Sequence, residues 1–270
     1  MDVAGKVIIV TGGGGGIGAG IAEAFAEKGA KVAVTDINLG YAQAEADRIG
    51  HGVIALSHDV TSLDSWAAVK REVEARLGPV DVVCNNAGIA LAFKTLDEVA
   101  PEEFDRVMAI NVRGVFNGCI TFMPEMKARK SGHIVNTSSV NGQLPFGPFA
   151  TYCASKFAVA GLSESIRQEL EPFGVGVSIL YPGLTRSRMS EGQMPELPEA
   201  AKQALAARMM EPVWLGRAVV RAVETGQLHI NSHVDHKPAL EARLNVLLDS
   251  FGEPAQPEYG GYVSAYANLN

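Results

Sequence analysis

The feature that most constrains the fold of this chain is a regular alternation of short apolar runs with helical patterns. The runs show little polar–apolar alternation, which is typical of strands that are covered on both faces. Right-handed β-α-β crossovers place helices on both faces of a parallel sheet. The sequence therefore predicts a doubly wound α/β fold with a mainly parallel, seven-stranded sheet. Its expected strands are Lys6–Val10, Lys31–Thr35, Val53–Ser57, Asp81–Cys84, His133–Ser138, Val175–Tyr181 and Leu228–Asn231.

Helical patterns fill the intervals between these strands. Glycines such as Gly29 and Gly50 directly follow two of them, as expected at helix C-termini. The predicted helices are Ile17–Lys28, Tyr41–Ile49, a helix capped by Thr61 or Ser62 that runs to Leu77, Pro101 to about Lys127, Thr151–Glu171, Pro212–Glu224 and Pro238–Phe251. The Met-rich stretch from Leu184 to Glu211 predicts a loop with short helices. We expect one domain over residues 1–251, with the substrate loop at 184–211, and a tail over 252–270.

Charge and cysteine usage exclude several classes of protein. Thirty acidic against 23 basic residues give a net charge of −7, which disfavours a general binder of nucleic acid or anionic membranes. The three cysteines show no CxxC spacing, which indicates a reducing compartment rather than a disulfide scaffold. The longest uncharged stretch, residues 131–155, is too polar for a membrane span. With a strand expected almost at once and no leader pattern, we expect a cytoplasmic protein.

A glycine-rich turn follows the first predicted strand and opens directly into a helix. Residues without Cβ atoms allow a positive φ and let a pyrophosphate approach the backbone. The helix N-terminus adds free N–H groups and a partial positive charge. The alternative is a flexible turn, but the strand–turn–helix context favours nucleotide binding. The candidate residues are Gly12, Gly15, Gly16, Ile17 and Gly18.

Asp36 ends the second predicted strand, where a carboxylate can accept hydrogen bonds from the adenosine ribose hydroxyls. It would also repel a 2′-phosphate, by about 4 kcal/mol at ~4 Å and an effective dielectric near 20. No Lys or Arg occurs among Gly12–Gly16 or Ile37–Gly40 to offset that charge. Although Asp36 could be an ordinary turn acid, its position favours NAD over NADP.

Tyr152 and Lys156 are four residues apart on a predicted helix, so both side chains project from one face. A nearby ammonium stabilises a phenolate, which is expected to lower the pKa of Tyr152 toward working pH. Tyr152 could then exchange a proton with an alcohol or ketone. Alone, such a pair is more often a surface feature. Ser138 and Ser139 end the fifth strand, where a parallel sheet presents groups to ligands.

Taken together, these residues resemble the short-chain dehydrogenase/reductase family, whose fold is a Rossmann fold. The resemblance runs from Lys6 to about Leu228. It rests on seven motifs in order, namely Thr11-Gly-x-x-x-Gly-x-Gly18, Asp59-Val60, Asn85-Asn-Ala-Gly88, Asn111, Ile134-Val-Asn-x-Ser-Ser139, Tyr152-x-x-x-Lys156 and Pro182-Gly183. Five consecutive glycines in the turn and a longer C-terminus, from His229 to Asn270, are the departures.

The resemblance implies a role for each matched residue. Tyr152 is the general acid/base, Ser139 holds the substrate oxygen with Ser138 as the alternative, Lys156 binds the nicotinamide ribose, and Asn111 holds a water for proton relay. The further residues implied to contact the cofactor are Asp36, Ile37, Asp59, Val60, Asn85, Asn86, Ala87, Gly88, Pro182, Gly183, Thr185 and Ser187, in addition to the glycine turn.

Apolar side chains in three segments around the expected site suggest a lipophilic or aromatic secondary alcohol as substrate. Each could instead be an ordinary core residue. The candidates are Leu91, Phe93, Leu144, Phe146, Phe149, Met189 and Met194. His229, His233 and His236 could suggest a metal, but no Cys accompanies them and we expect none. Tyr259, Tyr262 and Tyr266 could cover a neighbouring subunit, or belong to a frayed tail.

We therefore expect an NAD-dependent oxidoreductase that interconverts a secondary alcohol and its ketone. The family implies a homotetramer, or else a dimer. The enzymatic alternative is an NADPH-dependent carbonyl or 3-oxoacyl-thioester reductase, which Asp36 disfavours. The alternative from another class is a nucleotide-binding regulator without turnover, against which the intact Ser139, Tyr152 and Lys156 argue.

Overall fold

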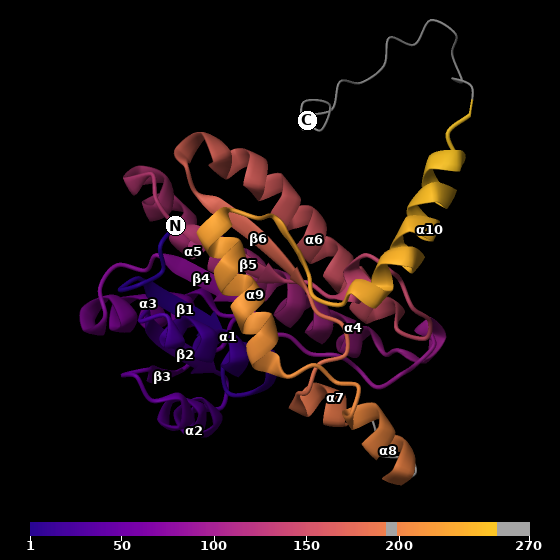
Figure 1. Ribbon diagram of the computed structural model, residues 1–270, viewed down its shortest axis with the longest axis horizontal. Coiled ribbons are helices and arrows are strands. Elements are labelled where there is room, and N and C mark those ends of the chain that lie inside the picture. Colours follow the sequence, from indigo (N-terminus) through magenta and orange to yellow (C-terminus); the bar gives the residue numbers. More distant parts are fainter. Residues whose placement is uncertain (193–198, 253–270) are drawn as a thin grey trace, which may run out of the picture. The chain divides into compact units, whose positions relative to one another are not determined.

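All seven strands of the sheet are parallel, in the order β3-β2-β1-β4-β5-β6-β7 (Figure 1). This computed structural model describes residues 1–192 and 199–252. The strand order reverses between β1 and β4, which opens a crevice for ligands at their carboxyl ends. The predicted fold is confirmed. The strands are β1 (Val7–Thr11), β2 (Lys31–Asp36), β3 (Ile54–Ser57), β4 (Val82–Asn85), β5 (His133–Thr137), β6 (Gly176–Tyr181) and β7 (His229–Asn231).

Helices lie within one or two residues of their predicted ends, apart from the long one that begins at Pro101. They are α1 (Gly16–Glu27), α2 (Leu39–Ile49), α3 (Leu63–Arg76), α4 (Pro101–Met108), α5 (Gly114–Arg129), α6 (Ala150–Leu170), α7 (Arg188–Gly192), α8 (Glu199–Ala206), α9 (Pro212–Thr225) and α10 (Lys237–Asp249). Short 3₁₀ turns are η1 (Leu96–Glu98), η3 (Val140–Gly142), η4 (Glu171–Phe173) and η5 (Val234–His236).

The predicted helix from Pro101 to Lys127 is interrupted. Its middle is a π-helical turn, η2 (Ala109–Arg113), which joins α4 to α5. Each amide in such a turn bonds to a carbonyl five residues back, so one extra residue is accommodated. The apolar pattern of the sequence does not encode this change of hydrogen bonding.

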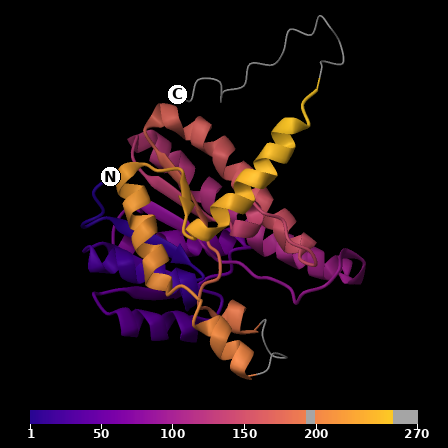
Figure 2. The same cartoon turned by 45° about the vertical axis from the view of Figure 1, so that its right-hand side comes forward.

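Helices lie on both faces of the sheet (Figure 2), and an apolar layer fills the space between the sheet and the helices on each face. Alternate residues of β1 enter opposite layers, Ile8 on one side and Ile9 on the other. The layer around Ile8 is built with α1, α2 and α9, and the layer around Ile9 with α3, α5 and α6. Burial on both faces explains why the strands are rich in Val and Ile without polar alternation.

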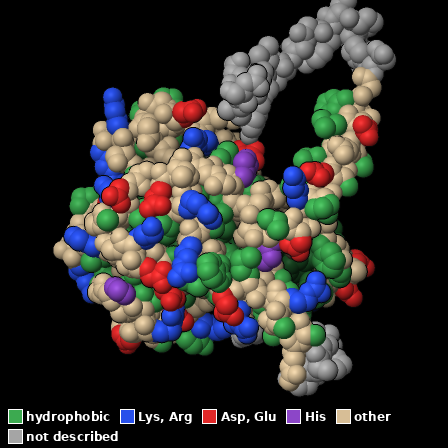
Figure 3. Space-filling model, in the orientation of Figure 1, with side chains coloured by type: hydrophobic (Ala, Val, Ile, Leu, Met, Phe, Trp, Pro, Cys, Tyr) green, Lys and Arg blue, Asp and Glu red, His purple; other side chains and the backbone are tan. Residues whose placement is uncertain are grey.

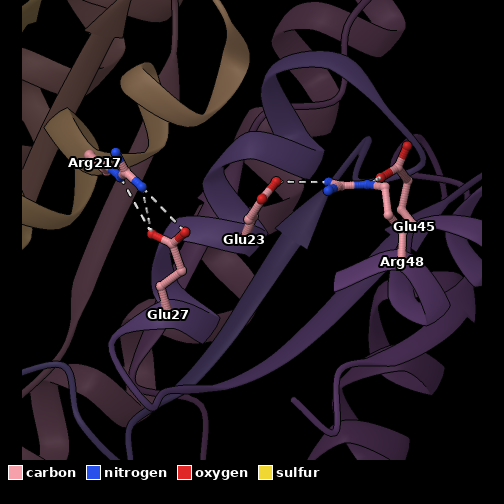
Figure 4. A network of polar contacts seen from close by, with 5 residues as sticks. All are labelled: Glu23, Glu27, Glu45, Arg48 and Arg217. Carbon is pink, nitrogen blue, oxygen red and sulfur yellow. Dashed lines mark hydrogen bonds and ion pairs between the residues drawn. The ribbon is translucent and has the colours of Figure 1, made fainter. Parts of the chain in front are cut away.

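Helices α1 and α9 cross at glycines. A Cβ atom at Gly216 would lie 2.9 Å from Ala24 Cβ, so only glycine permits this approach. At the exposed side of the contact Arg217 pairs with Glu27, at 3.2 Å between Nη2 and Oε2 (Figure 4). A second network joins α1 to α2, where Arg48 lies 2.8 Å from Glu23 and 2.7 Å from Glu45 (Figure 4). These pairs hold α1, whose N-terminus faces the glycine turn.

Residues 1–234 form one compact unit, and the residues from Asp235 onward form a second. Within the second unit the described part is α10 and its immediate neighbours. Hydrophobic side chains along α10 are exposed (Figure 3), with Val246 at 70% and Leu248 at 65%. The predicted tail with Tyr259, Tyr262 and Tyr266 lies outside the described residues.

Candidate active site

The turn between β1 and α1 has the geometry of an anion cradle. Gly12 and Gly16 have φ values of +62° and +54°, which L side chains rarely adopt. A Cβ at Gly12 would lie 2.9 Å from Ala87 Cα, and one at Gly18 would lie 2.7 Å from Asn86 Nδ2. Gly15, the N-cap of α1, supplies no side chain to the first N–H groups of the helix. The turn therefore suits a phosphate group, whose oxygens can accept from these N–H groups.

The segment after β4 is fastened to this turn. The Thr11 hydroxyl oxygen accepts from the N–H groups of Asn86, at 2.9 Å, and Ala87, at 3.0 Å. Asn86 Nδ2 donates to the Thr11 carbonyl at 3.0 Å. The expected cofactor residues from the two sides of the crevice are thus brought together.

Asp36 lies at the end of β2 beside the same turn. Its Oδ2 accepts from Gly14 N–H at 3.2 Å, and its Oδ1 accepts from Asn38 N–H at 3.0 Å. Ile37 follows and is 71% exposed. After β3, Asp59 accepts from the N–H and hydroxyl of Thr61, at 2.9 and 2.7 Å. The carboxyl ends of β2 and β3 place these side chains at the edge of the sheet where an adenosine would lie.

A cation that the sequence did not reveal lies at this turn. Arg188, the first residue of α7, donates a hydrogen bond from Nη2 to the Gly14 carbonyl. Its guanidinium carbon is 4.1 Å from the centre of the Tyr41 ring. The expectation that no Lys or Arg accompanies the turn holds for its neighbours in sequence but not in space, because Arg188 arrives from 174 residues further along the chain.

Ser139, Tyr152 and Lys156 converge at the carboxyl end of β5 and the start of α6. The side chains of Ser139 and Tyr152 are hydrogen-bonded to each other. Lys156 Nζ lies 5.5 Å from the centre of the Tyr152 ring and donates to the Thr137 carbonyl at 2.9 Å. One face of α6 therefore presents the phenol and the ammonium together, as the spacing in the sequence predicts.

Burial sets the protonation of this pair. It raises the pKa of Tyr152 to about 12, opposed by the hydrogen bond to Ser139, and lowers the pKa of Lys156 to about 8. This differs from the expectation that Lys156 brings the pKa of Tyr152 down toward working pH. Desolvation disfavours the charged form of each group, so the phenol and a readily deprotonated amine are favoured.

The two adjacent serines have different environments. Ser138 donates its hydroxyl proton to the Lys156 carbonyl at 2.8 Å, and only 1% of its surface is exposed. The Ser139 oxygen accepts from Asn141 N–H at 3.1 Å and also bonds to Tyr152. Of the two, Ser139 is therefore the one placed to share a substrate oxygen with Tyr152.

Asn111 occupies the π-helical turn and is completely buried. Its Oδ1 accepts from Ile89 N–H at 2.8 Å, and its Nδ2 donates to the Ile89 carbonyl and the Ser155 hydroxyl oxygen, at 2.9 and 3.0 Å. A Cβ at Gly88 would lie 3.2 Å from Asn111 Oδ1 and 3.4 Å from Lys156 Nζ. The π turn thus fixes the segment after β4 against α6.

The Pro182–Ser187 segment follows β6 and is held by a histidine that we considered only as a metal ligand. Gly183 N–H donates to His233 Nδ1 at 3.1 Å, and His233 Nε2 lies 3.2 Å from the Leu184 carbonyl. The Thr185 hydroxyl donates to the Gly183 carbonyl at 3.1 Å. The Ser187 hydroxyl lies 3.2 Å from that of Ser190. In the part of the chain that the structure describes, no group of three His, Cys, Asp or Glu could hold a metal ion.

Aromatic side chains extend outward from Tyr152. The ring centre of Phe149 lies 4.6 Å from that of Tyr152, and Phe93 lies 5.1 Å from Phe149. Phe146 lies 6.2 Å from Phe93, and Phe93 and Phe146 are more than half exposed. The other substrate candidates are less defined: Leu91 and Leu144 are half-buried, Met189 is 37% exposed, and Met194 lies outside the described residues.

The chain matches the family model of the short chain dehydrogenases over residues 6–197. It is 30% identical over 269 residues to a C alpha-dehydrogenase from Sphingobium sp. strain SYK-6, covering 92% of this chain and 87% of that protein. It is 35% identical over 216 residues to a 3-alpha-(or 20-beta)-hydroxysteroid dehydrogenase from Mycobacterium bovis, covering 80% and 81%. A short chain dehydrogenase/reductase from Burkholderia phymatum, solved in complex with NAD, superimposes with a TM-score of 0.82 at 28% identity, covering 95% and 99%.

The chain therefore belongs to the short-chain dehydrogenase/reductase family and is an oxidoreductase of that family. Its family binds a nicotinamide dinucleotide and acts on small molecules. None of the helices within residues 1–192 and 199–252 is sufficiently long and apolar to span a bilayer.

Proposed function

We propose that the protein is an NAD(H)-dependent dehydrogenase that interconverts a lipophilic, aromatic or cyclic secondary alcohol and its ketone. The observation that carries the proposal is the convergence of Ser139, Tyr152 and Lys156 beside Gly88, in the segment that is bonded to the glycine turn. The dinucleotide would be held by the turn, by the residues after β4 and, after β6, by Pro182, Gly183, Thr185 and Ser187. Once bound, its nicotinamide ring would accept a hydride from the alcohol carbon or return one to the ketone.

The residues of the chain handle the proton and the oxygen. Ser139 and Tyr152, already hydrogen-bonded to each other, would both bond to the substrate oxygen. In ketone reduction Tyr152 donates its phenolic proton to the carbonyl oxygen, and in alcohol oxidation its phenolate accepts the hydroxyl proton. A positive charge on Lys156 favours the phenolate, and Lys156 can itself give up a proton because its pKa is about 8.

Two observations support NAD as the cofactor. Asp36 is held at the end of β2, where its carboxylate can accept from ribose hydroxyls and repel a 2′-phosphate. The structurally similar Burkholderia phymatum protein is in complex with NAD. Preference for NADPH would instead favour the carbonyl or 3-oxoacyl-thioester reductase.

The aromatic row of Phe149, Phe93 and Phe146 supports an aromatic or polycyclic substrate. Rings prefer offset or edge contacts with one another, and the row begins against the phenol that exchanges the proton. The Sphingobium relative named C alpha-dehydrogenase and the Mycobacterium bovis hydroxysteroid dehydrogenase are in agreement with an alcohol-oxidising function.

The test combines turnover with binding. Tyr152→Phe should lower kcat by roughly 10²–10⁴-fold with aryl, steroid and aliphatic secondary alcohols, because the proton acceptor is lost. The dissociation constant for NADH, measured by fluorescence titration, should change little. Tyr181→Phe is the matched control, since its hydroxyl lies 3.3 Å from His229 Nδ1 on β7. Retained turnover in Tyr152→Phe would refute the assignment, and binding without turnover in the unmodified protein would favour a regulator.

We also propose a cytoplasmic homotetramer, with a dimer as the simpler assembly. Exposed apolar side chains on α5, Phe116 at 46% and Ile120 at 39%, offer a surface for a second copy. Light scattering during size-exclusion chromatography measures the assembly, and a monomer at all concentrations would contradict it.

A further inference from the structure

The cofactor turn and the substrate segment meet at Ser187 and at the exposed Arg188. Arg188 begins α7 within the 184–211 segment, and α7 lies below the beginning of α9 in Figure 1. A Cβ at Gly15 would lie 2.9 Å from Arg188 Nη2 and 3.0 Å from its guanidinium carbon. One at Gly16 would lie 2.8 Å from Ser187 Cβ. Ser187 and Arg188 therefore lie across the N-terminus of α1, where an anion binds.

The contacts that orient the Arg188 guanidinium leave several of its N–H donors without a hydrogen-bond acceptor in residues 1–192 and 199–252. Nη2 donates to the Gly14 carbonyl, and the plane lies over the Tyr41 ring at 4.1 Å. A guanidinium has five N–H donors in a fixed fork, so the remaining donors can serve an oxyanion. Among the described residues, no carboxylate forms an ion pair with Arg188. The charge is thus not neutralised by a carboxylate of the chain.

We propose that Arg188 is a phosphate-binding residue of the cofactor site, which bonds to the pyrophosphate of the dinucleotide from the substrate segment. The proposal rests on the proposed function, because it needs a dinucleotide at the turn. The pyrophosphate that binds at the α1 N-terminus would then also bind the first residue of α7. Binding of the cofactor and the position of Arg188 at the start of α7 are then linked, and each favours the other.

The pyrophosphate is favoured over a 2′-phosphate by position. Arg188 lies against Gly15, the N-cap of α1, and the adjacent Ser187 lies against Gly16, the first residue of that helix. Asp36, the group that repels a 2′-phosphate, bonds to the N–H of Gly14, whereas Arg188 bonds to its carbonyl. The two charged side chains therefore bond to the two successive peptide groups that flank Gly14, Asp36 to the Gly13–Gly14 peptide and Arg188 to the Gly14–Gly15 peptide, which is the one nearer to the N-terminus of α1.

The experiment measures the binding of NADH, NADPH, ADP and adenosine to the unmodified protein, to Arg188→Gln and to Arg188→Lys, by calorimetry and fluorescence titration. We expect Arg188→Gln to weaken NADH, NADPH and ADP by a similar factor of roughly ten, and adenosine hardly at all. Arg188→Lys should recover part of the loss, since it keeps the charge but not the fork.

Arg186→Gln is the matched control. Arg186 lies two residues earlier in the same segment but pairs with Glu211, at 2.9 Å between Nε and Oε1. It should bind all four ligands as the unmodified protein does. The thermal midpoint of each variant shows whether it is folded.

Three results would overturn the proposal: equal affinities for NADH in Arg188→Gln and the unmodified protein, an equal loss for adenosine, or a loss confined to NADPH. The last would assign Arg188 to the 2′-phosphate instead. Failure of the proposed function is a different outcome, in which the unmodified protein binds neither NADH nor NADPH.

Discussion

His58 should lower the free energy of unfolding as the pH falls, and His58→Asn should remove this part of the pH dependence. The ring follows β3, and only 2% of the residue's surface is exposed. It packs edge to face with the Trp66 ring, at 4.2 Å between the two ring centres. Nδ1 lies 2.9 Å from the Thr35 hydroxyl oxygen, while the buried Nε2 has no hydrogen-bond partner among the described residues. Desolvation of the imidazolium therefore lowers the pKa of His58 from 6.5 to about 4.

The sign of the effect follows from the proton count. Between pH 6.5 and 4 the unfolded chain carries a proton on this histidine and the folded chain does not, so acidification stabilises the unfolded state. With a folded pKa of about 4, His58 alone removes about 2 kcal/mol of unfolding free energy between pH 7 and pH 4.5. Burial lowers the pKa of His133 to about 3, which adds a contribution of the same sign.

Urea unfolding at pH 7 and pH 4.5, followed by tryptophan fluorescence, measures the loss directly. His58→Asn is expected to be less stable at pH 7 but to lose about 2 kcal/mol less than the unmodified protein on acidification. The matched control is His51→Asn, an exposed position with φ of +51°, which Asn tolerates. If His58→Asn and the unmodified protein lose the same free energy between the two pH values, the burial argument is wrong.

Two further predictions concern packing and substrate choice. Gly216→Leu should lower the free energy of unfolding, measured by chemical denaturation, by about 1–3 kcal/mol, because the leucine side chain would meet Ala24. Arg217→Ala should lower it by under about 1 kcal/mol, because the pair of Arg217 with Glu27 is exposed. Equal losses in the two variants would contradict the close approach of α1 and α9. Phe149→Leu should lower kcat/KM for aryl alcohols about two- to tenfold relative to aliphatic ones, through the lost ring contact; an equal change for both substrate classes would show that the aromatic row does not select the substrate.

Sequence reasoning reached those features that nearby residues determine. Val- and Ile-rich runs predicted the strands because both faces of the sheet are buried, and the four-residue spacing of Tyr152 and Lys156 placed both on one face of α6. The glycine turn could be located because a left-handed φ and a close backbone approach need glycine.

What the sequence did not reveal depends on contacts between distant segments. Arg188 meets Gly14 across 174 residues, and no local pattern marks an arginine in a loop as part of a phosphate turn. His233 was weighed as a metal ligand, whereas its ring nitrogens face the backbone of Gly183 and Leu184. The pKa of Tyr152 depends on how deeply its surroundings exclude water, which residue spacing cannot express.

The π-helical turn at Ala109–Arg113 makes the length of this helix as important as its composition. One residue corresponds to about 100° of rotation in an α-helix. Because the π turn accommodates one extra residue, an α-helical turn with the same number of residues would rotate α4 by that angle relative to α5 and turn Asn111 away from Ile89 and Ser155. A related sequence can therefore exchange many side chains along α4 and α5, but an insertion or deletion between them has to be absorbed by a change in the π turn itself.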